Sequence, residues 1–117
     1  MPGFELINNE EKKAVNSIFN NGGILFAHGF EKSRKNFHVR EFEKKICDYF
    51  KCKYALAVTS GTAAIKIGLK SLNVKPGDEV ITQAFNFIAT IEAIIDVGAK
   101  PILVNVDRTL NMDIEDL

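Results

Sequence analysis

The chain has 117 residues, of which 46% are hydrophobic and 26% are charged, and this composition is typical of a globular protein with a core. Its 15 basic and 15 acidic residues give a formal net charge of zero, which does not favour a nucleic-acid partner. No apolar run is long enough to cross a bilayer, and residues 1–6 lack the basic start and apolar region of a signal peptide. We therefore predict a soluble protein with no nucleic-acid or membrane partner.

Cys47 and Cys52 are the two cysteines of the chain, and neither has a Cys or His neighbour at the spacing of a zinc site. We predict two free thiols in a reducing compartment, by default the cytoplasm, and no metal site. His28 and His38 are similarly isolated, which favours surface or loop positions over a role as ligand or base.

The N-terminal third predicts two helices joined by a long loop. The first helix covers residues 9–19, with acidic residues at its start and a stop at residues 20–23. Residues 24–36 have no clean period, and their basic cluster at 32–35 indicates either a functional or partner-binding loop or an ordinary solvated run. The second helix is predicted over residues 39–50.

The central stretch predicts a short buried strand at residues 55–58, a joint, and a helix at about residues 63–72. Ser60 or Thr59 can cap that helix, and Gly61 lets the backbone turn sharply. Such a joint points free amides and a positive helix end to one place, which predicts an anion site for a phosphate. The alternative is a well-capped joint that binds nothing.

The C-terminal half predicts a strand at residues 79–83, a joint at 84–86, a helix at 87–96 and a strand at 102–107. Strands and helices thus alternate, which predicts an α/β fold with a mostly parallel sheet and flanking helices. Ligands of such sheets bind at the carboxyl ends of the strands, where both joints lie. Asp113 begins a helix-like start just before the chain stops, so we expect the N-terminal part of a larger protein or a truncated product.

Taken together, these segments resemble the DegT/DnrJ/EryC1/StrS family of sugar aminotransferases, which are pyridoxal-phosphate enzymes of fold type I. The resemblance runs from about residue 42 to the end of the chain. The motifs that carry it are Phe42-Glu43, Tyr54-Ala55-Leu56-Ala57-Val58, Ser60-Gly61-Thr62-Ala63-Ala64, Pro76-Gly77-Asp78-Glu79-Val80-Ile81-Thr82, Phe87-Ile88-Ala89-Thr90, Gly98-Ala99-Lys100-Pro101 and Val106-Asp107. The resemblance implies an N-terminal arm at residues 1–38 and the first part of the large, cofactor-binding domain at 39–117.

The resemblance also implies roles for four residues. Gly61 and Thr62 would bind the phosphate of pyridoxal phosphate, with Ser60 shaping the turn. Phe87 would stack on the pyridine ring; Phe85 is the less favoured candidate, and core packing is the other reading of Phe87. The catalytic lysine of the family lies further downstream, so no catalytic residue is expected in this segment.

The activity implied is the transfer of an amino group from an amino acid, with glutamate as the expected donor, to a nucleotide-linked keto sugar in a homodimeric enzyme. A dehydratase or lyase relative, or a non-catalytic fragment, are the alternatives. Residues 22–39 depart from the usual short Gly-rich approach of the family, which leaves the substrate open. A Rossmann-type domain is disfavoured, because no Gly-x-Gly-x-x-Gly follows a predicted strand.

Overall fold

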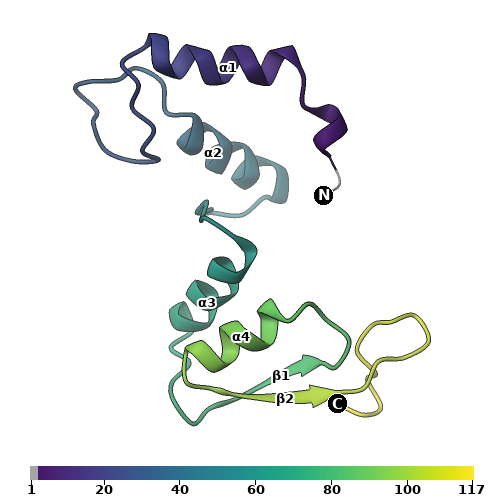
Figure 1. Cartoon of the computed structure of the whole chain (residues 1–117). Helices are drawn as coiled ribbons and strands as arrows, with labels where there is room; N and C mark the ends of the chain where they lie inside the picture. Colours follow the sequence, from purple (N-terminus) through teal and green to yellow (C-terminus); the bar gives the residue numbers. More distant parts are fainter. Residues whose placement is uncertain (1–2) are drawn as a thin grey trace. The chain divides into compact units, whose positions relative to one another are not determined.

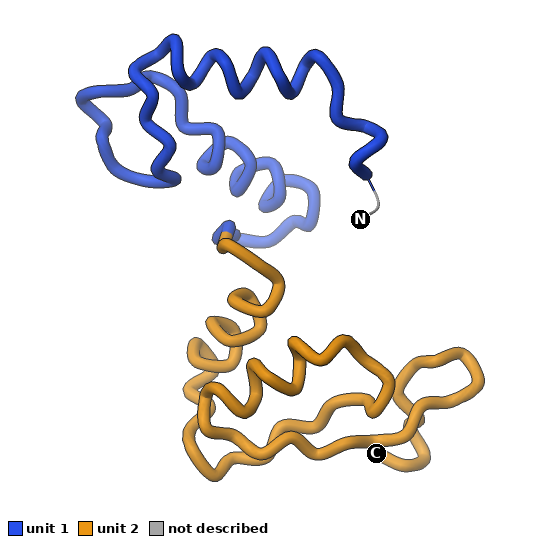
Figure 2. The backbone as a smooth tube through the Cα atoms, viewed as in Figure 1, with its two compact units in different colours: residues 1–57 blue, residues 58–117 orange. Residues whose placement is uncertain are grey.

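The computed structural model describes residues 3–117, which divide between Ala57 and Val58 into two compact units (Figure 2). The predicted domain division at residues 38 and 39 stays a prediction. Figure 1 shows the elements in chain order. They are the 3-10 helix η1 (Phe4–Leu6), the helices α1 (Asn9–Asn20), α2 (His38–Phe50) and α3 (Gly61–Ser71), the strand β1 (Glu79–Gln83), the helix α4 (Ala89–Asp96) and the strand β2 (Lys100–Val104).

The helix α1 begins with a capping box, which explains why it starts where its sequence indicates. The side chain of Asn8 accepts a hydrogen bond from the amide of Glu10 at 2.8 Å, and the carboxylate of Glu11 accepts one from the amide of Asn8 at 2.7 Å. Gly22 follows the helix with a φ of 101°, a backbone conformation that glycine adopts without strain. The predicted helix and its stop are confirmed.

Residues 24–36 contain neither an α-helix nor a strand, as predicted, and α2 begins one residue before the predicted start. The guanidinium of Arg34 fixes this loop by donating hydrogen bonds to the carbonyl oxygens of Phe26 and Ala27. Its central carbon also lies 4.4 Å from the ring centre of Phe37. The reading of Arg34 as part of a solvated run is therefore wrong, because its side chain is used inside the loop.

The cysteines of α2 and the turn after it are both free. Cys47 is half-buried and Cys52 is exposed, and the amide of Cys52 donates to the carbonyl oxygen of Cys47 at 3.1 Å. Burial raises the pKa of the Cys47 thiol, with a further contribution from the Cys52 thiol. Within residues 3–117, no helix is long and apolar enough to span a membrane, and no group of three or more His, Cys, Asp or Glu residues could hold a metal ion.

The second unit is a small parallel β-α-β arrangement. The strands β1 and β2 pair in parallel, with Ile81 opposite Ile102, and α4 connects them (Figure 1). The helices α3 and α4 pack against each other, and α4 also packs on β2. Ile94, Val97 and Ala99 form the buried centre, with Leu69, Val74 and Val80 packed around it. The α/β class and the parallel sheet are confirmed.

The sequence pattern of residues 87–96 predicts a buried stripe of Ile88, Ile91, Ile94 and Ile95, and the buried face of α4 differs from it. Ala89, Ala93 and Ile94 are buried, whereas Ile88 and Ile95 are 57% and 58% exposed. Two alanines on the inner face occupy little space, so the helix can approach the neighbouring elements closely there. The helix also begins at Ala89 rather than at residue 87.

The predicted strand at residues 55–58 is absent from the structure, which corrects a three-stranded sheet to a two-stranded one. A strand requires a hydrogen-bonded neighbour, and among residues 3–117 β1 and β2 pair only with each other. The sequence pattern indicates that such a segment is apolar, but it does not indicate whether another strand is available to pair with it.

The last strand and the C-terminal turn also differ from prediction. The strand β2 ends at Val104, which pairs with Gln83, the last residue of β1. Beyond it, Asp107 accepts hydrogen bonds from the amide and hydroxyl of Thr109 at 2.8 and 2.6 Å, and these bonds lower the pKa of its carboxyl group. The carboxylate of Asp113 accepts from the amide of Glu115 at 3.0 Å, as a cap would, but residues 114–116 form a turn.

Candidate functional site

The candidate site is the start of α3, where Ser60 caps the helix. Ser60 has an extended backbone, and its hydroxyl oxygen accepts a hydrogen bond from the amide of Ala63 at 3.1 Å. Its carbonyl oxygen accepts from the amide of Ala64 at 3.0 Å. Of the two predicted caps, Ser60 and Thr59, the structure uses Ser60.

The amides of Gly61 and Thr62 are the two backbone donors at this helix start to which Ser60 provides no acceptor. They are the first two amides of α3, so no preceding turn of the helix can accept from them. Within residues 3–117, neither makes a hydrogen bond to another group. Two adjacent free amides at the positive end of a helix dipole are suited to bind an anion.

Gly61 has a different conformation from the one that its sequence position predicts. It is the first residue of α3 and has no positive φ, so the prediction that it provides the sharp turn is wrong. The extended backbone of Ser60 makes the change of direction instead. A Cβ atom added at Gly61 would meet nothing within 4 Å. Packing within the described chain therefore does not explain this glycine, whereas close approach of a bound group to its backbone would.

Thr62 lies beside an open hollow of about 410 Å³ between α3 and α4, which Glu92, Ala93, Ile95 and Asp96 also line. The carboxylate of Asp96 pairs with the ammonium of Lys66, and this hydrogen bond is the main cause that lowers the pKa of Asp96. Two acidic side chains on the α4 wall disfavour an anion inside the hollow. The groups suited to an anion here are therefore the amides at the helix start.

Phe85 and Phe87 lie on the joint between β1 and α4, and both are exposed. The exposed fraction is 78% for Phe87 and 62% for Phe85, so the reading of Phe87 as a core residue is wrong for the described chain. The side chain of Asn86 fixes the joint, because it donates to the hydroxyl of Thr82 at 3.1 Å and to the carbonyl oxygen of Gln83 at 2.6 Å. Ser60, Gly61 and Thr62 are thus adjacent, while Phe87 comes from a separate segment.

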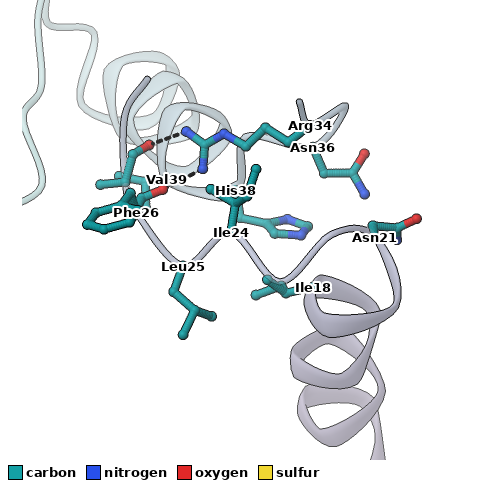
Figure 3. Close-up of a pocket in the computed structure, with 10 residues that line it drawn as sticks. Ile18, Asn21, Ile24, Leu25, Phe26, Arg34, Asn36, His38 and Val39 are labelled. Atoms are coloured by element: carbon teal, nitrogen blue, oxygen red, sulfur yellow. Dashed lines mark hydrogen bonds between the residues drawn. The ribbon is translucent and has the colours of Figure 1, made fainter. Parts of the chain in front are cut away.

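A second candidate is a cavity of about 100 Å³ in the first unit, between the end of α1, the loop and the start of α2 (Figure 3). Its walls are mostly apolar, and Arg34, Asn36 and His38 are the polar side chains on the loop side. The guanidinium of Arg34 is engaged with the two loop carbonyls, and its Nε atom is covered without a hydrogen-bond partner within residues 3–117. This cavity therefore reflects how the loop is held, and it offers a ligand no free charged group.

Glu43 is a functional residue for which the sequence indicates only a place in the Phe42-Glu43 motif. The structure shows that its carboxylate accepts a hydrogen bond from the amide of Ala57 at 2.9 Å. The only signal in the sequence is an acidic residue beside Phe42, outside the apolar face of the predicted helix, where acidic residues are common.

Comparisons with known proteins agree with these observations. Residues 6–117 match the model of the DegT/DnrJ/EryC1/StrS aminotransferase family. Over 76 residues, the chain is 43% identical to the UDP-2-acetamido-2-deoxy-3-oxo-D-glucuronate aminotransferase of Pseudomonas aeruginosa, a match that covers 64% of this chain and 21% of that protein. The chain thus spans about a fifth of the length of this curated relative.

Two solved structures extend the comparison to the fold. The PLP-form of Spr1654 from Streptococcus pneumoniae is 30% identical with a TM-score of 0.78, and the match covers 92% of this chain and 25% of that one. The GDP-4-keto-6-deoxy-D-mannose-3-dehydratase of E. coli, with bound hydrated PLP, is 28% identical with a TM-score of 0.76, and the match covers 93% and 28%. The predicted resemblance and its fold are confirmed.

Proposed function

The chain belongs to the DegT/DnrJ/EryC1/StrS aminotransferase family, and from this premise we propose that it is part of a pyridoxal-phosphate-dependent sugar aminotransferase. The substrate would be a nucleotide-linked keto sugar, which is the class of compound named for the Pseudomonas aeruginosa relative. Glutamate would be the amino donor, and the complete protein would be a homodimer of the cytoplasm. The catalytic lysine is expected outside residues 1–117.

The observation that carries this proposal is the pair of free amides at the start of α3. The helix start fits a phosphate for two reasons. Gly61 has no side chain to cover its backbone, and the hydroxyl of Ser60 accepts from the amide of Ala63, so the amides of Gly61 and Thr62 stay free. The hydroxyl of Thr62 adds a side-chain donor at the same helix end. Pyridoxal phosphate, when bound, acts as an electron sink for the amino-group transfer.

This chain's own residues would bind and orient the cofactor. The helix start holds the phosphate, and the exposed ring of Phe87 provides an apolar plane for stacking on the pyridine ring. Asn86 stabilises the backbone from which Phe87 projects. Together these groups would bind the cofactor and orient it for the groups that complete the site.

The test uses the full-length protein that contains these residues, purified and supplied with pyridoxal phosphate. We expect an absorbance band of the bound cofactor that disappears when glutamate is added, because the amino group moves to the cofactor. Alanine or another amino acid in place of glutamate is the control for the donor. A full-length protein that acquires no such band would contradict the proposal.

A dehydratase is the second candidate, and the similarity to the E. coli GDP-4-keto-6-deoxy-D-mannose-3-dehydratase favours keeping it. The two activities would share the phosphate site described above. They differ at the position of the catalytic lysine, where a histidine would favour dehydration. Release of water from the sugar, without a change in its amino content, would identify this activity.

Replacing Phe87 by leucine in the full-length protein is expected to weaken pyridoxal phosphate binding about 2- to 10-fold. Aromatic stacking contributes roughly 0.5–1.5 kcal/mol beyond area burial, and leucine lacks the planar face. The matched control is Phe85→Leu, two residues away and also exposed, which should leave the affinity within about twofold. A larger effect at Phe85 than at Phe87 in a cofactor titration would reverse the assignment.

A further inference from the structure

Glu43 is an unusually covered carboxylate for its helix. Its side chain is 14% exposed, whereas that of Glu41 on the same helix is 64% exposed. The covered carboxylate has two neighbours, both from the first unit. Its Oε1 atom accepts from the amide of Ala57 at 2.9 Å and lies 3.9 Å from Nε2 of His28. Covering a charged group costs free energy unless hydrogen bonds compensate, so these contacts explain how the position is maintained.

The amide of Ala57 belongs to the apolar segment at residues 55–58, which forms no strand in the described chain. Ala55, Ala57 and Val58 are half-buried there. A half-buried backbone amide without a strand neighbour needs another acceptor. The carboxylate of Glu43 provides it, and a charged acceptor forms a stronger hydrogen bond than a neutral carbonyl does.

The place of Ala57 in the chain gives this contact a consequence. Only Val58 and Thr59 separate Ala57 from Ser60, the cap of α3. Fixing the backbone at Ala57 restricts the conformations of the two residues that lead to the free amides of Gly61 and Thr62. A binding site whose backbone is already restricted loses less conformational freedom when it binds its ligand.

We propose that Glu43 is a positioning residue for the phosphate-binding start of α3, acting through its hydrogen bond to the amide of Ala57. The inference rests on the proposed function, because it assigns a role in holding pyridoxal phosphate. The imidazole of His28 also lies beside the carboxylate of Glu43, so the loop at residues 24–36 contacts the same side chain. Glu43 itself does not touch the cofactor.

The experiment compares three variants of the full-length protein with the wild type. Glu43→Ala removes the acceptor and is expected to weaken pyridoxal phosphate binding about tenfold and to speed hydrogen exchange at the Ala57 amide. Glu43→Gln keeps an acceptor oxygen without the charge, and it should restore most of the affinity and protection. Glu41→Ala removes an exposed carboxylate from the same helix and should behave as the wild type.

Rescue by glutamine separates the hydrogen bond to Ala57 from a need for negative charge at this position. Equal affinity of Glu43→Ala and wild type would overturn the inference, as would a loss of affinity with unchanged protection of the Ala57 amide. If Glu43→Ala does not fold, Glu43→Asp replaces it: the shorter side chain should lose the contact while Glu43→Gln keeps it. A wild-type protein that binds no pyridoxal phosphate would instead reject the proposed function, and this outcome is distinct because exchange at Ala57 needs no cofactor.

Discussion

Replacing Thr62 by valine is expected to weaken binding of pyridoxal phosphate by the full-length protein roughly 10- to 150-fold. Valine has nearly the shape of threonine, so the change removes the hydroxyl donor and little else. A hydrogen bond to a charged group contributes about 1.5–3 kcal/mol, and each 1.4 kcal/mol is a tenfold change in affinity. The dissociation constant, measured by titration of the apoprotein with the cofactor, checks this expectation.

Ser71→Ala is the matched control for this experiment. Ser71 lies at the other end of α3, is exposed, and donates its hydroxyl to the carbonyl oxygen of Gly68 at 2.8 Å. Its loss removes one hydroxyl from the same helix without touching the proposed site, so the affinity should not change. Cofactor affinity that is the same for wild type and Thr62→Val would show that the hydroxyl of Thr62 does not bind the phosphate.

The helices and the strand β1 were predictable because their signals are local. Acidic residues at the start of α1, and the two glycines after it, define that helix within a few positions of sequence. The strand β1 lies between the turn at residues 75–78 and the joint at 84–86, and its predicted bounds match the structure. Such signals depend on neighbours in the chain, which sequence pattern reports directly.

The absence of a strand at residues 55–58 was not predictable in the same way. Their apolar run is typical of a buried strand, but strand formation depends on a distant partner that local pattern does not report. The structure instead satisfies the amide of Ala57 with the side chain of Glu43, fourteen residues earlier. The contacts of Arg34 were not predictable for the same reason. Its charge indicated a solvent-exposed side chain, but its guanidinium donates hydrogen bonds to carbonyl oxygens within the loop.

The candidate site was predictable in part for a similar reason. A serine before a helical pattern predicts a cap, and a capped helix start leaves the amides that Gly61 and Thr62 present. The role predicted for Gly61 was wrong because glycine is favoured both in a sharp turn and at a helix start that a ligand approaches closely. Only the backbone angles distinguish these two cases. That the glycine lacks a packing reason became evident only with the space around it.

Replacing Gly98 by alanine is expected to destabilise the protein by about 2–5 kcal/mol. Gly98 has a φ of +86°, which costs alanine roughly 1–2 kcal/mol. Its new Cβ atom would also lie 2.9 Å from Cγ and 3.1 Å from Cβ of Pro76. A proline ring cannot rotate away as a flexible side chain can, so the backbone must shift, which typically costs a further 1–3 kcal/mol.

Gly77→Ala is the control that isolates the steric part of this effect. Gly77 has a φ of +93°, and an added Cβ atom would meet nothing within 4 Å. It should therefore show the conformational cost alone, about 1–2 kcal/mol. The two glycines are also joined by a hydrogen bond, from the amide of Gly77 to the carbonyl oxygen of Gly98 at 3.1 Å. The two variants therefore change the same pair of hydrogen-bonded turns.

The contact between Gly98 and Pro76 matters because it brings together the two turns that precede β1 and β2. Next to it, the amide of Lys100 donates to the carbonyl oxygen of Asp78 at 2.8 Å, which begins the parallel register of the two strands. Val97 and Ala99, on either side of Gly98, are both buried in the core. A shift at Gly98 thus disturbs the register and the core together. Denaturation that showed equal losses for Gly98→Ala and Gly77→Ala would contradict this close approach.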